Sequence, residues 1–234
     1  MDARGQQILQ QLQAVQVERT RRQGEPKLEQ AVTAVKAFQH ARFAHTYGDL
    51  LADPRCAPAA RFFLDDLYGP RDFSGRDAQF ARVVPALVRL FSEEVVHTVL
   101  EVATLHALSE TLDTRMGEAL GTRSLDGPTY AEAWRETGQP EARERQISLI
   151  VDIGTSLGRH TRSPMLRHSL RLMRLPAQAA GLGALQDFLE TGFEAFRQLP
   201  DVAGFLAVVA RRERDLARAL FSGDPGAPPL PVRG

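Results

Sequence analysis

The sequence predicts an all-α protein that folds as a single globular multi-helix bundle of about nine or ten helices. Nearly every segment carries apolar residues three and four positions apart, and no segment alternates apolar and polar residues as a half-buried strand does. The 234 residues fit one large domain, which buries enough surface to fold without a disulfide or a metal. Glycine and proline divide the apolar pattern into pieces of helix length.

The first predicted element is an amphipathic helix within residues 1–25, rich in glutamine and arginine. Its apolar stripe is narrow and too short to predict a coiled coil. The stripe consists of Ile8, Leu12 and Val15. Gly24 ends this helix, and Pro26 suits the first turn of the next one.

Residues 26–221 are expected to form the helical domain. Its predicted helices cover 26–52, 57–68, 75–91, 93–120, 129–137, 140–160, 164–174, 177–198 and 201–221. Pro85 predicts a kink near Arg82, and Gly181 and Gly183 mark a bend or a close helix contact. Residues 222–234 contain four prolines and three glycines in thirteen positions, so we expect a disordered tail.

The amino-acid composition limits the ligands, the cellular location and the source organism that we expect. Twenty-nine basic residues balance twenty-nine acidic ones, which argues against nucleic acid and against an anionic membrane as ligands. The first residues, MDARGQQILQQLQ, lack an apolar signal core, and no apolar run approaches the ~18 residues of a membrane span, so we expect a cytoplasmic protein. Lys27 and Lys36 are the only lysines, and this arginine bias with abundant alanine and leucine is typical of a high-GC bacterium.

The stretch FFLDDLYGPRDFSGRDAQFAR, residues 62–82, combines many charged and aromatic residues at a predicted helix–turn–helix corner. In a structural interpretation, Ser74 and Asp77 form a capping box, with Ser74 as the capping residue. Asp72 pairs with Arg76 across the turn, and Asp65 pairs with Arg61 one helical turn earlier. The charges would then hold the angle between two helices.

The same stretch also supports two functional interpretations: a ligand site and a surface for a protein partner. Aspartates there could hold a hard cation, and Tyr68 with Arg71 could bind an anionic or aromatic ligand. Helical isoprenoid synthases place a third aspartate where this chain has Gly69, so that pattern fails. The candidate residues are Asp65, Asp66, Tyr68, Arg71, Asp72, Arg76, Asp77 and Arg82.

Metal and cofactor motifs are incomplete. Glu94 and His97 form one Glu-x-x-His pair, whereas a di-iron bundle needs two with two further glutamates, and His97 can simply pair with Glu101. Cys56 is alone, which excludes an intrachain disulfide and a thiolate cage. A haem would need only one histidine, and His40, His45 or His106 would each serve. We predict no metal and no cofactor.

Charge is distributed unevenly along the chain. No acidic residue lies between Ile153 and Gln186, a segment with five arginines and two histidines. Residues 92–118 carry six acidic residues against one arginine. We predict that this acidic helix lies beside the basic one, with a solvated basic face or a site for phosphate or an acidic partner as alternatives. The candidate anion-binding face consists of Arg167, Arg171 and Arg174.

Three segments have distinctive amino-acid sequences: RFFLDDLYGPRDFSGRDAQFARVVP at 61–85, LHALSETLD at 105–113 and AAGLGALQDFLETGFEAF at 179–196. With them, the chain resembles an uncharacterised family of proteobacterial all-helical proteins that shares the FFLDDLYGPRDFSGRD-type motif. The resemblance covers roughly residues 40–220. It implies a helical fold, and it transfers neither an activity nor catalytic residues.

Two functional hypotheses follow. The first is a non-enzymatic interaction or regulatory protein, which binds a protein partner through the N-terminal helix or the basic face. The second is a helical enzyme or small-ligand binder with a pocket at the Asp65–Arg82 corner. We favour the first because no complete catalytic set can be assembled, and we leave a homo-oligomer open. Corner residues paired with one another would support the first, and a deep pocket would support the second.

Overall fold

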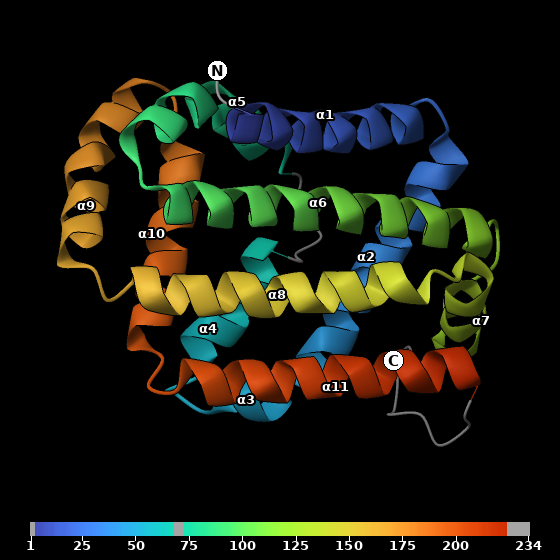
Figure 1. The fold of residues 1–234 in the computed structure, drawn as a ribbon. Coiled ribbons are helices and arrows are strands. Elements are labelled where there is room, and N and C mark those ends of the chain that lie inside the picture. The colour runs from blue at the N-terminus through green and yellow to red at the C-terminus, as the bar shows by residue number, and fades with distance from the viewer. Residues whose placement is uncertain (1–2, 68–72, 224–234) are drawn as a thin grey trace.

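The computed structural model describes residues 3–67 and 73–223, and every regular element in these ranges is helical. The predicted all-α class is therefore confirmed (Figure 1). The segment predicted to be a disordered tail lies outside the described residues from residue 224 onward. Tyr68, Arg71 and Asp72 also lie outside them. No helix in the described part of the chain is long and apolar enough to cross a membrane.

The described residues form eleven α-helices and one π-helix. They are α1 (Ala3–Gln23), α2 (Pro26–Thr46), α3 (Gly48–Ala52), α4 (Ala57–Arg61), the π-helix η1 (Phe62–Leu67), α5 (Ser74–Leu90), α6 (Glu93–Leu120), α7 (Gly127–Thr137), α8 (Pro140–His160), α9 (Pro164–Ala179), α10 (Gly183–Gln198) and α11 (Val202–Ser222).

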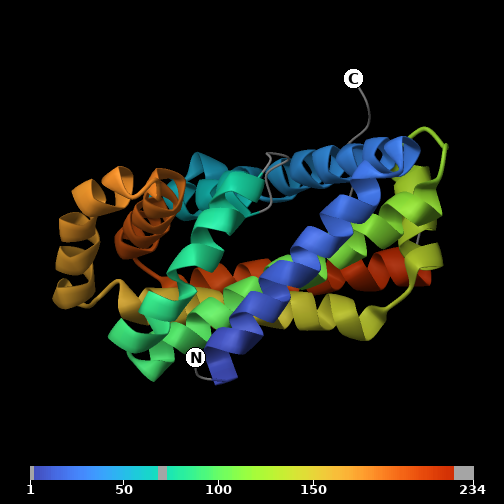
Figure 2. The ribbon, with the colours of Figure 1, turned by 90° about the horizontal axis from the view of Figure 1, so that it is seen from above.

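Helix α6 is the centre of the bundle. It packs against α1, α2, α7 and α8, and α8 packs in turn against α11. Figure 1 shows α1, α6, α8 and α11 as a row of long helices, with α2 crossing behind them. Both views place α9 and α10 at one end of this row and α7 at the other (Figure 2). The loop at 121–126 thus reverses the chain at the end opposite α9.

The apolar stripe of α1 is part of the core. Ile8 is 0% exposed and packs in one cluster with Leu12, Val84 of α5 and Val96 of α6. A second cluster surrounds Tyr130 and Trp134 of α7, and a third, rich in phenylalanine, joins η1, α8, α10 and α11. Because its apolar side chains are buried, α1 is held as an integral helix of the bundle.

Two glycines allow α8 and α11 to approach closely. A Cβ atom on Gly154 would lie 2.5 Å from Cδ2 of Leu206, and one on Gly158 would lie 2.9 Å from Cγ1 of Val202. These positions are one turn apart, so they form a groove on α8 into which the α11 side chains fit.

Two predicted helix boundaries were wrong. The helix predicted over 26–52 breaks at Tyr47, whose side chain is fully buried. The helix predicted to end at 174 continues through Pro176 to Ala179, and the chain then turns at Gly181, whose φ is 70°. Proline removes the amide that would bond the carbonyl of Leu172, but Leu172 is 63% exposed, so water can replace that bond.

The segment predicted as a helix over 57–68 changes from α to π geometry at Phe62. Phe62, Phe63 and Leu64 are all buried, with at most 6% of their surface exposed. Three consecutive buried residues do not fit the narrow stripe of an α-helix, and the wider π turn accommodates them. Asp65 and Asp66 belong to the same π turn, so its geometry sets the direction of their side chains.

Candidate functional site

The described corner residues come from two elements: Asp65 and Asp66 from η1, and Arg76, Asp77 and Arg82 from α5. They do not converge on one cavity. Asp65 lies near α2, Asp77 faces α1 and α6, and Arg82 donates a hydrogen bond of 3.1 Å to the carbonyl of Ala180. The structure therefore separates the candidate set into three local environments.

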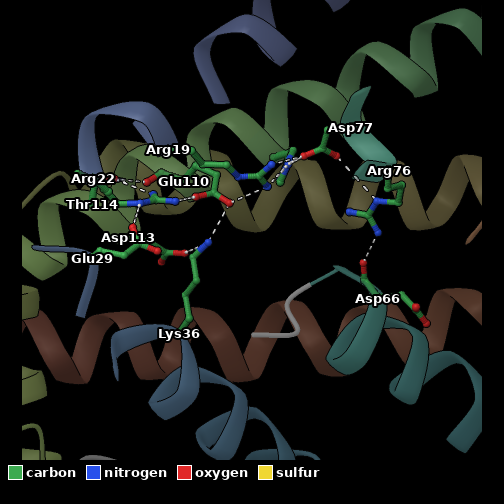
Figure 3. A network of polar contacts seen from close by, with 11 residues as sticks. Arg19, Arg22, Glu29, Lys36, Asp66, Arg76, Asp77, Glu110, Asp113 and Thr114 are labelled. Atoms are coloured by element: carbon green, nitrogen blue, oxygen red, sulfur yellow. Dashed lines mark hydrogen bonds and ion pairs between the residues drawn. The ribbon is translucent and has the colours of Figure 1, made fainter. Parts of the chain in front are cut away.

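Arg76 joins three elements. Its Nη1 donates to the backbone carbonyl of Asp66 at 2.8 Å (Figure 3). The guanidinium carbon lies 4.0 Å from the ring centroid of Phe73 and 4.4 Å from that of Phe188 on α10. Burial lowers the pKa of Arg76, against the charges of Asp77 and Asp66. The side chain thus acts as a tether between η1, α5 and α10.

Asp77 does not have the partner that a capping box requires. Helix α5 begins at Ser74 with Phe73 as its N-cap, and Phe73 makes no side-chain capping hydrogen bond. The Asp77 carboxylate instead accepts from Arg19 of α1 at 2.8 Å and lies 2.9 Å from Nε2 of His106 on α6. Burial favours the neutral acid, but His106 and the two neighbouring arginines outweigh it, so the pKa of Asp77 is lowered. The predicted capping box was wrong because the stronger charged partners lie on other helices.

Glu110 is the centre of a buried ion network (Figure 3). It is 3% exposed. One carboxylate oxygen lies 2.7 Å from Nη2 of Arg22, and the other lies 2.8 Å from Nζ of Lys36 and 3.3 Å from Nη2 of Arg19. Burial would raise the pKa of Glu110, but the three cations hold it at about 2. The network therefore joins α1, α2 and α6 by charge-assisted contacts.

Arg22 and Asp113 extend the network. Arg22 is 4% exposed; it donates to Oγ1 of Thr114 at 3.0 Å, and its Nε lies 3.3 Å from Glu29. Asp113 lies 3.9 Å from Nζ of Lys36. Burial raises the pKa of Asp113, helped by the charge of Glu110 and opposed by Lys36. The two acids of α6, one turn apart, are therefore biased toward opposite protonation states.

Asp65 faces a different neighbour from the one predicted. Its Oδ1 lies 3.3 Å from Nε2 of His40 on α2, and about a third of each side chain is exposed. Among the described residues the expected pair with Arg61 is not formed. Asp65, Asp66 and Arg61 instead line one side of an open groove of about 490 Å³, with Glu190 and Glu194 of α10 on the other.

The acids of this groove are largely engaged. Glu190 pairs with Arg174 and accepts from Gln186 at 2.8 Å, and Glu194 accepts from Arg197 and from Gln198 at 2.7 Å. No group of three or more His, Cys, Asp or Glu side chains within residues 3–67 and 73–223 is placed to hold a metal ion. His97, considered above for a di-iron site, lies 3.4 Å from Glu101 as the simple pair predicts.

The candidate basic face lies on α9, and its three arginines have different surroundings. Arg174 forms an ion pair with Glu190, and Arg167 is half-buried with an Nε that has no hydrogen-bond partner among the described residues. Arg171 is exposed, and its side chain makes no hydrogen bond or ion pair within the described chain. The basic face is thus partly neutralised by α10 and partly open.

The acidic helix lies beside two basic segments, which are α1 and the end of α8 with Arg159 and His160, but not beside α9. Arg19, Arg22 and Arg21 of α1 reach Glu110 and Glu118 of α6. The prediction chose residues 159–174 because their run of arginines is long and free of acids. It missed α1, where Arg19 and Arg22 are three residues apart and both reach Glu110. That spacing, which places both arginines on one helix face, is the signal in the sequence that could have identified the network.

Helix α9 also carries exposed apolar side chains that the sequence analysis did not single out. Met165 is 72% exposed, Leu172 is 63% exposed and Leu175 is 75% exposed. Together with the exposed His168, they lie at positions i, i+3, i+7 and i+10, which define one face of a helix. We call these four residues the outer face of α9. Helix α9 packs mainly on α10, and Figures 1 and 2 show it at the edge of the bundle.

Comparison with protein families gives a match over most of the chain. The family described as domain of unknown function (DUF8198) matches residues 18–227, so the chain belongs to this family. The match begins within α1 and includes Arg19 and Arg22. No curated protein and no solved structure matches the chain.

Proposed function

We propose that this DUF8198 protein is a non-enzymatic interaction protein that binds a protein partner through the outer face of α9. The observation that carries the proposal is the exposure of three large apolar side chains on one helical face. Single exposed apolar residues are common, but an aligned group on one face is typical of a binding surface.

The state of the corner supports a non-enzymatic function. Arg76 is held by Asp66, Phe73 and Phe188, and Asp77 is held by Arg19 and His106. Catalytic acids and bases need access to a substrate. Side chains that are enclosed by partners from the fold itself are better explained as structural contacts.

Because the apolar stripe of α1 is buried, α1 is no longer the preferred surface for a partner. The N-terminal helix was one of two surfaces considered for a partner, but Ile8, Leu12 and Val15 pack in the core. Helix α9 presents apolar side chains to solvent and retains open positive charge beside them. The outer face of α9 therefore becomes the preferred docking surface.

A small-ligand site in the groove between η1 and α10 is the second candidate. Two observations favour it: π-turns recur at functional sites, and the groove contains carboxylates from two elements. The ion pairs that already engage Glu190 and Glu194 make it the weaker candidate.

The cellular setting is proposed from the sequence. The arginine-rich composition and the FFLDDLYGPRDFSGRD-type motif support a proteobacterial origin, and a cytoplasmic location is part of the proposal. Fractionation of the source cells, with the protein detected by an antibody, would test the location.

Crosslinking and copurification from the source cells test the interaction. The bait proteins are the wild type, the triple variant Met165→Ser/Leu172→Ser/Leu175→Ser, and the control Val17→Ser, which changes a 60% exposed residue on α1. We expect a partner that is enriched with the wild type and the control and lost with the triple variant. Equal enrichment with all three baits would refute the proposed surface.

A further inference from the structure

We infer that the outer face of α9 binds an acidic amphipathic helix of a different protein. This inference rests on the proposed function and adds the chemistry of the partner. Its observations are the position of the open positive charges, the spacing of the apolar side chains and the way that α10 neutralises only one edge of α9.

The arginines along α9 differ in how far acidic residues of α10 neutralise them. On the edge toward α10, Arg174 pairs with Glu190, and the charge of Arg167 acts on Glu194. Arg171 of α9 and Arg162 of the turn before it are exposed; the charge of Arg171 acts on Glu190, but neither side chain makes a hydrogen bond or ion pair with the described residues. Positive charge therefore remains where a partner would dock, and it complements a negative partner.

The local sequence strengthens this asymmetry. No acidic residue occurs between Asp152 and Asp187, so α9 and its preceding turn contribute no negative charge of their own. The whole chain is neutral, with 29 basic and 29 acidic residues. The positive character is thus a property of this surface and not of the protein.

The apolar spacing indicates the shape of the partner. Met165 and Leu175 are ten residues apart, which is about 15 Å along the helix axis. Positions i, i+3, i+7 and i+10 form a narrow stripe that matches the apolar stripe of a second helix. A partner helix with leucine-type residues on one face and Asp or Glu beside them would bury the stripe and face Arg171.

A second copy of this chain fits the surface less well. In a twofold contact between two outer faces, Arg162 and Arg171 of one copy would lie near the same residues of the other. Neither face supplies an acidic residue, so the contact would bring like charges together.

An anionic membrane also fits less well. Membrane binding by an interfacial helix grows with its buried apolar area and is helped by tryptophan and phenylalanine. The outer face offers three aliphatic side chains and no aromatic one, and the opposite side of α9 is already packed on α10. A compact protein surface uses such a short stripe better than a lipid bilayer does.

The inference is tested with two designed peptides of about 20 residues, long enough to span the stripe as a helix. Both have the same leucine stripe; one is flanked by glutamates and the other by lysines. Fluorescence anisotropy measures the binding of each labelled peptide to the full chain. We expect the acidic peptide to bind at least about tenfold more tightly, and to lose affinity as salt rises from about 0.05 M to about 0.5 M.

Matched variants locate the binding. Arg171→Glu and Leu172→Ser should each weaken the acidic peptide by about tenfold. The controls are Arg211→Glu, an exposed arginine of α11 without a side-chain partner in the described chain, and Val17→Ser. Both controls should bind as the wild type does. Equal binding of the two peptides, or equal loss in the controls, would overturn the inference.

Two further measurements test the alternative occupants of the outer face of α9, which are a second copy of this chain and an anionic membrane. Sedimentation velocity that shows a dimer lost in Leu172→Ser would assign the surface to a second copy. Tighter binding to phosphatidylglycerol vesicles than to the acidic peptide, lost in the same variant, would assign it to a membrane. If copurification finds a partner that depends on Leu172 but not on Arg171, the interaction function stands and the acidic partner is refuted.

Discussion

The ion network between α1 and α6 and the outer face of α9 use the same residue types in opposite ways. In the network, Arg22 and Glu110 are at most 4% exposed and meet at 2.7 Å. On α9, Arg171 is exposed and makes no side-chain hydrogen bond or ion pair in the described chain, and it lies beside leucines that are more than 60% exposed. Charges satisfied within the fold position a helix, whereas charges left open beside apolar side chains are available to a partner.

The network fixes the register of α1 along α6. Arg19 and Arg22 face Glu110 and Thr114, so a shift of α1 by one turn would separate buried charges from their partners. Apolar contacts such as those of Ile8 tolerate sliding better than ion pairs do. We infer that the network contributes specificity of position more than it contributes net stability.

Removing Glu110 should have the largest effect on stability. Glu110→Ala removes the buried carboxylate that Arg19, Arg22 and Lys36 share, and it leaves the buried Arg22 with Glu29 at 3.3 Å as its remaining acidic partner. Breaking a buried pair in this way costs about 3–5 kcal/mol. Urea unfolding followed by circular dichroism measures the loss.

Glu118→Ala is the matched control on the same helix. Glu118 pairs with Arg21, but its side chain is 40% exposed, so the substitution should cost less than about 1 kcal/mol. Similar losses in the two variants would show that the buried and exposed pairs are equivalent, and would break the contrast between the two regions.

Acid should remove the contribution of Glu110. Its pKa is about 2 in the folded state against 4.5 for the free side chain, so its stabilisation is present above pH 4.5 and is lost as pH falls toward 2. The difference corresponds to about 3 kcal/mol. The free energies of unfolding of the wild type and Glu110→Gln should therefore converge as pH falls below 4.5.

Asp113 acts in the opposite direction, because burial raises its pKa. Its contribution is greatest at low pH and declines as pH rises, so it cannot mimic the acid loss predicted for Glu110. A difference between the wild type and Glu110→Gln that stays constant from pH 6 to pH 3 would contradict the assigned pKa, because these two pH values lie on either side of 4.5, the pKa of the free side chain.

Helix positions were largely predictable from sequence, and the network was not. The apolar spacing located α6 at 93–120 and α8 at 140–160, because it depends on residues within one turn of each other. Arg19 and Glu110 are 91 residues apart, and nothing local links them. The π-turn at Phe62 and the partner of Asp77 likewise depend on tertiary packing, which local periodicity does not contain.

Asp77→Asn should cost about 2–3 kcal/mol, more than a lost helix cap would. The substitution keeps the size of the side chain but removes the charge that Arg19 and His106 contact at 2.8 and 2.9 Å. Denaturation measures the loss, and a double variant Asp77→Asn/Arg19→Met tests the coupling. Additive effects in the double variant would show that the two residues do not interact.

Arg76→Lys should cost about 1–2 kcal/mol, mostly by loss of stacking. Lysine keeps the charge but cannot lie flat between Phe73 and Phe188, whose ring centroids are 4.0 and 4.4 Å from the guanidinium carbon. Arg89→Lys on the exposed side of α5 is the control, and it should be neutral. An Arg76→Lys variant as stable as the wild type would show that Arg76 does not act as a tether between η1, α5 and α10.

Leu172→Ala should have the smallest effect, within about 0.5 kcal/mol of the wild type. Leu172 is 63% exposed, so truncating it removes little buried surface, whereas Leu112→Ala changes a leucine that is fully buried in α6 and should cost about 2–5 kcal/mol. Thermal unfolding of the two variants compares one residue type on the two sides of the contrast. A loss above about 1 kcal/mol at Leu172 would mean that the fold already covers this side chain. The outer face of α9 would then be part of the folded body, and not a surface available to a partner.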